Sequence, residues 1–182
     1  MTIEQLIPGF RPETALERVL ASDPTLLSGL AWGTPRPGHP EGSVGVHVGD
    51  ILAAITEPAG RRRRELRFLA LVHDGLKQRV RPDRGRSPEN DHAVLGRWFA
   101  ERYVTDRRLL VTLELHDEPY RIWRSDRSTA ALAAMLARVP DLDLFLRFVE
   151  LDGSTPGKDP RPLTWLRRVV AARAGDGYPL AA

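Results

Sequence analysis

The chain carries ionisable side chains at positions that a helix would turn towards the protein interior. Each lies three or four residues from apolar residues of the same segment, which is the spacing of one helical face. His47, for example, shares a face with Val44 and Ile51. The residues with this pattern are His47, His73, His92, His116 and Asp152. Buried polar groups are costly unless they are paired, so together they predict a shared partner.

A single histidine on an apolar face is usually a core residue with a satisfied hydrogen bond. Four histidines and a carboxylate on different predicted helices favour a metal centre instead, because helix bundles build such centres from side chains on facing helices. The chain has no cysteine. The expected cofactor is therefore a divalent ion that accepts nitrogen and oxygen ligands: Mn, Fe, Co, Ni, Zn or Mg.

The dipeptide His73-Asp74 adds a carboxylate beside one of these histidines. Adjacent helical residues point about 100° apart, so Asp74 can bridge two metals or hold a water on one metal. Lys77 follows one turn after His73, and its side chain can reach the entrance to the same metal site. There it can bind phosphate or protonate a leaving oxygen, and a solvated lysine is the alternative. We expect Asp74 and Lys77 to be the catalytic residues.

The elements that must position these residues are predicted from apolar residues that recur at helical spacing. A loop rich in Pro and Gly is expected at 33–42, and polar loops are expected at 78–90, 117–126 and 152–160. The expected helices span about 13–21, 43–57, 62–77, 91–103, 106–116, 127–138, 141–151 and 161–173. No alternating strand pattern accompanies them. We predict an all-α fold, a single bundle of about seven or eight helices.

The length of 182 residues suits one compact domain. We expect residues 1–182 to form it, with a core at about 38–173, an N-terminal helix and loop at 1–37, and a tail at 174–182. No apolar run approaches the roughly 20 residues that cross a bilayer, and the N-terminus does not resemble a signal peptide. We therefore expect a cytoplasmic protein. The net charge is only +3, and the basic run 61–64 is interpreted as a solvated helix start rather than a phosphate site.

Five segments resemble motifs of the HD superfamily of metal-dependent phosphohydrolases, whose signature is H…HD…D. LALVHDGLK is similar to the apolar run and HDxGK motif of the family, with Leu76 where the family has glycine. The closest likeness is to the HD domain of bacterial CCA-adding tRNA nucleotidyltransferases, and it spans roughly residues 38–157. The similar segments are GHPEGSVGVHVGDIL, LALVHDGLK, DHAVLGRWF, LVTLELHD and FVELDGSTPG. The 182 residues contain no nucleotidyltransferase head, and we expect a stand-alone HD domain.

This resemblance implies hydrolysis of a phosphomonoester, a nucleotide or a 2′,3′-cyclic phosphate by attack of metal-bound hydroxide. It implies a small phosphorylated, nucleotide-like substrate as the partner. His92 and His116 fall where two-metal members place further ligands, although one tightly bound metal is the favoured expectation. The metal ligands that it implies are His47, His73, Asp74 and Asp152.

Other residues are candidates for contacts around this centre. Arg79 and Arg81 lie in the polar connection after Lys77 and can bind phosphate bidentately, although a merely soluble loop is favoured. His39 and Glu41 precede the His47 helix and can line the pocket or support the ligands. Asp117 is interpreted as a loop cap rather than a ligand, and Trp123 is the best candidate to stack on a nucleobase.

Two further functions fit the same sequence. The first is a non-catalytic module that keeps the metal site in order to sense a nucleotide. The second is a helical RNA-associated protein in which arginines bind phosphates and the histidines are structural. The intact HDxxK run and the full ligand set favour the enzyme.

Overall fold

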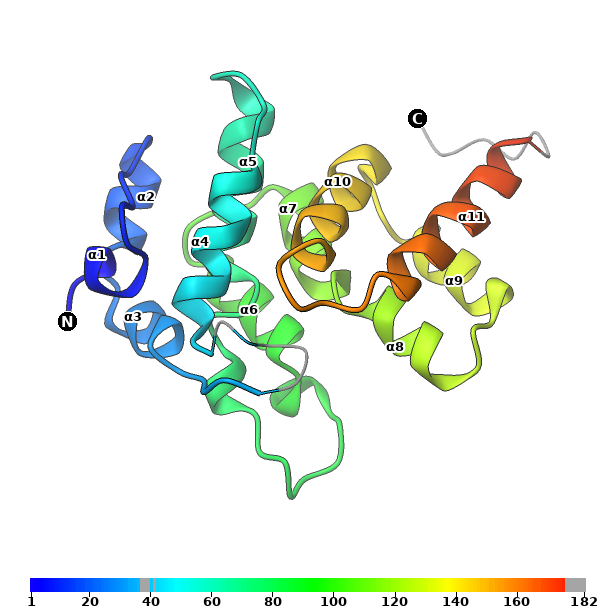
Figure 1. The fold of residues 1–182 in the computed structure, drawn as a ribbon, viewed down its shortest axis with the longest axis horizontal. Coiled ribbons are helices and arrows are strands. Elements are labelled where there is room, and N and C mark those ends of the chain that lie inside the picture. The colour runs from blue at the N-terminus through cyan, green and yellow to red at the C-terminus, as the bar shows by residue number, and fades with distance from the viewer. Residues whose placement is uncertain (37–39, 41, 176–182) are drawn as a thin grey trace.

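The computed structural model describes residues 1–36, 40 and 42–175, and this part of the chain is built from helices without a β-sheet (Figure 1). The all-α prediction is thus confirmed. The α-helices are α1 Ile3–Leu6, α2 Ala15–Leu20, α3 Pro24–Leu30, α4 Val44–Ala54, α5 Arg61–Val72, α6 His92–Ala100, α7 Arg107–Leu115, α8 Glu118–Ser125, α9 Thr129–Leu136, α10 Leu142–Gly153 and α11 Arg161–Gly175. Two short 3-10 helices, η1 Lys77–Arg79 and η2 Pro88–Asn90, lie between α5 and α6.

Each of the eight predicted helices overlaps a helix of the structure, and α1, α3 and α8 are additional. The helix predicted over 62–77 ends earlier, because α5 stops at Val72 and the chain turns at His73 to Leu76. The expectation of a loop at 117–126 is wrong, because α8 occupies most of it. Pro119 lies in the first turn of α8, where a helix needs no backbone donor, so it begins the helix instead of interrupting it. The short helix α3 begins in the same way, with Asp23 as the N-cap and Pro24 as the first residue.

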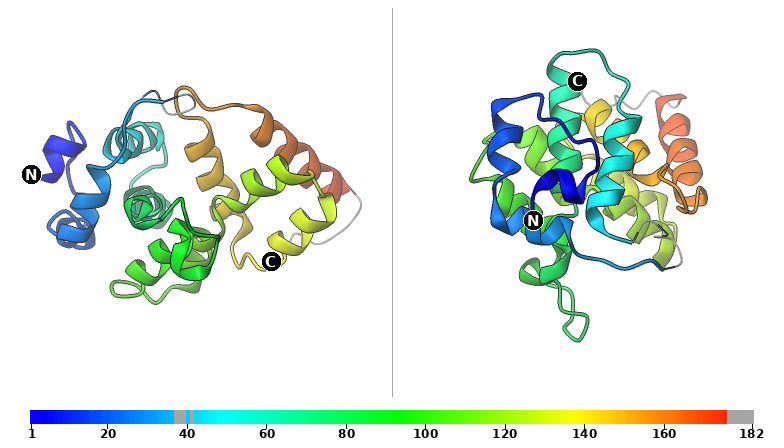
Figure 2. Two further views of the ribbon diagram at one scale, coloured as in Figure 1. Left: turned by 90° about the horizontal axis from the view of Figure 1, so that it is seen from below. Right: turned by 60° about the vertical axis from the view of Figure 1, so that its left-hand side comes forward.

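The core consists of two apolar clusters that meet at α7 and α10. The larger cluster gathers side chains from α1 through α7 and one face of α10, including Phe148. The smaller cluster lies between α7, α9, α10 and α11 and includes Phe145 on the other face of α10. Figures 1 and 2 show α1 to α3 at one end of the molecule and α8, α9 and α11 at the other. The helices between them carry the polar residues singled out above.

Two contacts attach the N-terminal helices to the segment around His73-Asp74. Buried Arg67 of α5 donates to both carboxylate oxygens of Glu17 on α2, at 2.9 and 2.8 Å. Gly29 of α3 lies so close to the turn after α5 that an added Cβ would stand 1.7 Å from the carbonyl oxygen of Gly75. The turn with His73 and Asp74 is therefore supported from outside by α3.

No helix in the described part of the chain is long and apolar enough to span a membrane.

Candidate metal centre

Six polar side chains that come from five helices or their ends meet in the interior. His47 lies within α4, and Asp152 lies in the last turn of α10. His73 and His116 each occupy the residue directly after α5 and α7, and His92 is the first residue of α6. All six are at most 8% exposed: His47, His73, Asp74, His92, His116 and Asp152. The sequence thus predicted which residues the fold brings together.

Five of these six positions are at or just beyond helix ends, where the backbone changes direction. His73 keeps helical backbone angles and donates its N–H to the Leu69 carbonyl, but Gly75 and Lys77 already form tighter turn bonds. Gly96 of α6 packs against this turn, because an added Cβ would lie 3.4 Å from the His73 carbonyl oxygen. The sequence thus places glycine where α6 closely approaches the turn that carries His73.

The six side chains form two neighbouring groups of three, each able to hold a metal ion. One group is His47, His73 and Asp152, and the other is Asp74, His92 and His116. Within each group, one ligand atom per residue lies within 4.8 Å of the others.

Asp74 faces both groups at once. Its Oδ2 atom is 3.4 Å from His73 Nε2 and 4.0 Å from His47 Nε2. Its Oδ1 atom is 3.4 Å from His92 Nε2 and 3.7 Å from His116 Nε2. A carboxylate with one oxygen towards each of two histidine groups has the arrangement of a bridging ligand.

Backbone carbonyls fix the orientation of two imidazoles. The Nδ1 atom of His73 is 2.9 Å from the Ala70 carbonyl oxygen, and Nδ1 of His116 is 2.8 Å from the Leu113 carbonyl oxygen. A carbonyl oxygen only accepts, so each Nδ1 carries a proton and each Nε2 faces the centre. Such a hydrogen bond on the far nitrogen is typical of metal-ligating histidines.

The centre fits a cation because several of its buried atoms have no hydrogen-bond partner among the described residues. The unpartnered atoms are His73 Nε2, His92 Nε2 and Asp74 Oδ1. Each such atom costs about 1–3 kcal/mol of stability when it stays unsatisfied. Divalent ions in the two groups would satisfy all three, and nitrogen and carboxylate oxygen are suitable donors for them.

Two carboxylates stay ionised in spite of burial. Burial raises the pKa of Asp74, but the neighbouring imidazole of His73 and the ammonium ion of Lys77 outweigh it and hold that pKa well below the usual range. Burial likewise opposes ionisation of Asp152, and Lys158 and His47 bring its pKa well below the usual range. Both residues therefore offer negative oxygens at neutral pH.

The histidines differ in their protonation. Burial lowers the pKa of His73, and it lowers the pKa of His92 to about 4, so both imidazoles are neutral at pH 7. Burial also lowers the pKa of His116, but the Asp74 carboxylate outweighs it and raises that pKa above the usual value. Neutral His73 and His92 are in the form that binds metals.

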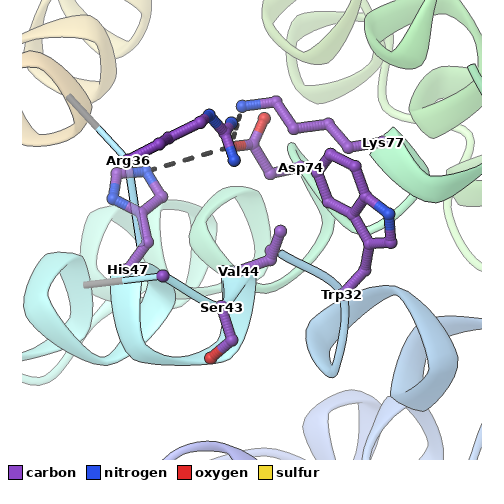
Figure 3. A pocket seen from close by; sticks show the side chains of 8 residues that line it. Trp32, Arg36, Ser43, Val44, His47, Asp74 and Lys77 are labelled. Atoms are coloured by element: carbon purple, nitrogen blue, oxygen red, sulfur yellow. Dashed lines mark hydrogen bonds and ion pairs between the residues drawn. The ribbon is translucent and has the colours of Figure 1, made fainter. Parts of the chain in front are cut away.

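The centre opens to the surface through a pocket beside Asp74, His47 and Lys77 (Figure 3). Lys77 Nζ lies 2.5 Å from Asp74 Oδ2, and the lysine side chain is 22% exposed. Figure 3 shows the side chain of Arg36 reaching towards Asp74 and Lys77. The remaining lining residues are Trp32, Gly42, Ser43 and Val44. The mouth of the pocket therefore carries positive charge next to an exposed aromatic ring.

Trp32 and Arg36 were not predicted as part of this site. They lie in the segment between α3 and α4, whose ends are joined by a hydrogen bond of 2.9 Å from the Val44 N–H to the Trp32 carbonyl. Gly33 permits this approach, since a Cβ there would stand 2.4 Å from the Gly42 carbonyl oxygen. The dense Pro/Gly pattern was the available signal, because it indicated a rigid segment just before the His47 helix.

Other predicted contacts lie elsewhere or outside the described residues. Arg79 lines a separate surface pocket with Trp98, and the backbone N–H of Arg81 donates to Asn90 Oδ1. Asp117 lies 3.3 Å from Arg121 and belongs to neither ligand group. His39 and Glu41 lie outside the described residues.

Two further sequence interpretations concern arginines and Trp123. Arg127 and Arg161 lie over the Trp123 ring, 5.0 and 5.5 Å from its centroid, away from the residues that line the pocket. In the basic run, Arg61, Arg62 and Arg63 are each ion-paired with a carboxylate. These arginines thus have intramolecular partners.

Neutral imidazoles, two ionised carboxylates and a basic mouth can together bind divalent cations and bring an anion next to them. Comparison of the chain with protein-family models, with curated proteins and with solved structures gives no match.

Proposed function

We propose that this protein is a metal-dependent phosphohydrolase that acts on a phosphomonoester, a nucleotide or a 2′,3′-cyclic phosphate. The position of Asp74 carries the proposal, because its two oxygens face two separate groups of potential ligands. A pair of metals joined by a carboxylate is a common arrangement in phosphate-ester hydrolysis. The resemblance of the LALVHDGLK segment to the HD superfamily supports the same activity.

In this proposal His47, His73 and Asp152 would hold one ion, His92 and His116 would hold a second, and Asp74 would contact both. Divalent ions polarise a phosphoryl oxygen and lower the pKa of water. Asp74, which is ionised at neutral pH, would orient the attacking water and accept its proton.

Lys77 and the mouth of the pocket supply the positive charge that the substrate needs. Burial lowers the pKa of Lys77, but Asp74 outweighs it and raises that pKa above the usual value, so the side chain is an ammonium ion. In the proposed reaction it binds a phosphoryl oxygen and donates a proton to the leaving oxygen. Arg36 lines the same pocket and adds a second cation for an anionic substrate.

A hydrolysis panel tests this function. Purified protein is incubated with Mn²⁺ and a nucleoside monophosphate, a 2′,3′-cyclic nucleotide or a chromogenic phosphate ester, and the product is measured. We expect hydrolysis of at least one class, and we expect chelation of the metal or the Asp74→Ala substitution to abolish it. Metal binding without hydrolysis of any class contradicts the enzyme and favours the sensor. RNA binding without metal binding favours the RNA-associated protein.

A further inference from the structure

A second lysine lies at the metal centre, on the side of Asp152. Lys158 Nζ is 3.9 Å from Asp152 Oδ1, and the lysine side chain is only 15% exposed. Lys77 lies closer to Asp74, with 2.5 Å between Nζ and Oδ2. Each carboxylate of the centre thus has its own ammonium neighbour.

The choice of lysine is specific in this chain. Of its 27 basic side chains, only Lys77 and Lys158 are lysines, and all others are arginines. Both lysines are placed at the metal centre. An ammonium is a compact point charge on a flexible stem, whereas guanidinium is a planar fork. Because the ammonium ion needs no fixed two-point geometry, it can leave one anionic partner and bind another more readily than a guanidinium can.

The loop after α10 brings Lys158 back over the centre. Thr155 Oγ1 donates to the Asp152 carbonyl at 3.0 Å, and the Lys158 N–H donates to the Thr155 carbonyl at 3.3 Å. Gly157 has φ +82° and packs against Pro40, since an added Cβ would stand 2.4 Å from Pro40 Cδ. Lys158 is therefore held where this loop meets the segment that borders the pocket.

We propose that Lys158 and Lys77 form a lysine pair that binds the terminal phosphate of the substrate, which makes a phosphate monoester the preferred class. This inference rests on the proposed function. In the metal-free protein the two ammonium ions balance the charges of Asp74 and Asp152. Divalent cations held by these carboxylates would neutralise them instead, which would leave the two ammonium ions free to bind an anion.

The number of cations favours a terminal phosphate over a diester. A phosphate monoester carries about −1.5 to −2 charge at pH 7 and three oxygens that can accept hydrogen bonds. A diester carries a single charge and offers only two such oxygens. Two separate ammonium ions therefore match the monoester.

Binding of inorganic phosphate to the Mn²⁺-loaded protein tests the inference by calorimetry. The variants are Lys158→Gln, Lys158→Arg as the charge-restoring substitution, and Arg161→Gln as the control. Arg161 lies near Lys158, but its side chain is 75% exposed and paired with Asp159. Binding of Mn²⁺ is titrated first for each variant, and circular dichroism verifies the fold.

We expect Lys158→Gln to bind Mn²⁺ as tightly as the wild type or more tightly, and to bind phosphate at least tenfold more weakly. Lys158→Arg, which keeps the charge but not the shape of the ammonium group, should recover part of the phosphate affinity, and Arg161→Gln should leave it unchanged. In hydrolysis, Lys158→Gln should lower kcat/KM more for a monoester than for a diester.

The two proposals fail in different ways. If Lys158→Gln binds both Mn²⁺ and phosphate like the wild type, Lys158 is only a counter-ion of Asp152 and the inference is overturned. If the wild type binds no Mn²⁺, the proposed function itself is wrong.

Discussion

At the scale of single residues, Asp74 connects the two ligand groups, and its loss should affect both. We predict that Asp74→Asn weakens Mn²⁺ binding and lowers the rate of phosphate-ester hydrolysis at least about a hundredfold, because an amide is a poor metal ligand and a poor proton acceptor. Calorimetry and a rate assay measure the two effects. Asp117→Asn is the matched control, since Asp117 is next to His116 but outside both groups. Equal effects of the two substitutions contradict the role given to Asp74.

The pH dependence of stability reports on His92. Its pKa is about 4 in the folded protein because of burial, against 6.5 for an ordinary histidine. Between these values the unfolded chain binds a proton that folded His92 does not, so stability falls as the pH is lowered from 6.5 to 4. His116 has a raised pKa, so the folded protein binds its proton more readily than the unfolded chain does, and this residue makes stability rise as the pH is lowered.

We therefore predict that the Tm of the metal-free protein falls over this interval, and that it falls less in His92→Gln. Thermal melts at a series of pH values measure the difference. The contribution of His116 is present in both proteins and largely cancels. Parallel Tm curves for the two proteins contradict a neutral, buried His92.

The ligand residues other than Asp74 were predictable because each continues the apolar face of its own helix, and burial of several such side chains calls for a common partner. Trp32 and Arg36 were not predictable in this way. They lie in a segment without helical spacing, and their place at the pocket depends on how glycines let that segment close on itself.

At the scale of elements, the packing of α3 against the turn after α5 should be essential. We predict that Gly29→Ala destabilises the protein by at least about 2–3 kcal/mol and weakens Mn²⁺ binding, because the new Cβ collides with the Gly75 carbonyl beside Asp74. Chemical denaturation and calorimetry measure these effects. Gly49→Ala on α4 is the control, since its Cβ would meet only an Ile7 methyl group at 3.5 Å. A stable Gly29→Ala variant with normal Mn²⁺ binding would show that α3 does not support the turn after α5.

The ion pair between α2 and α5 gives a second test at this scale. Glu17→Ala removes both hydrogen bonds of the buried Arg67 guanidinium to Glu17 and leaves it only the more exposed Glu13 carboxylate, so we predict a loss of about 3 kcal/mol in the free energy of unfolding. Glu13→Ala removes this more exposed partner of Arg63 and Arg67 and should cost at most about 1 kcal/mol, because Arg67 keeps Glu17. Urea denaturation compares the two. A smaller loss for Glu17→Ala than for Glu13→Ala rejects this ranking.

Helical spacing predicted the long helices because their apolar faces are continuous over several turns. It missed the short helices α1 and α3, and it treated the segment of α8 as a loop. Tertiary packing stabilises these: α8 buries Tyr120, and α3 buries Leu26 and Leu30. Their N-terminal signals, such as Asp23 before Pro24, were present in the sequence.

At the scale of the whole molecule, metal binding should be linked to folding. The ligands come from five helices or their ends, so the folded chain binds the ion and the unfolded chain does not. The ion then raises the free energy of unfolding by RT ln(1 + [L]/Kd), where [L] is the concentration of free metal ion. It would also give a partner to the buried atoms of His73, His92 and Asp74 that have no hydrogen-bond partner.

The most direct measurement is therefore the divalent metal content of the purified protein, together with its Tm before and after chelation. We predict up to two bound ions per chain, a fall in Tm on chelation, and recovery of Tm with added Mn²⁺. A protein that contains no divalent metal and whose Tm does not respond to Mn²⁺ or Ni²⁺ contradicts the metal centre and the function built on it.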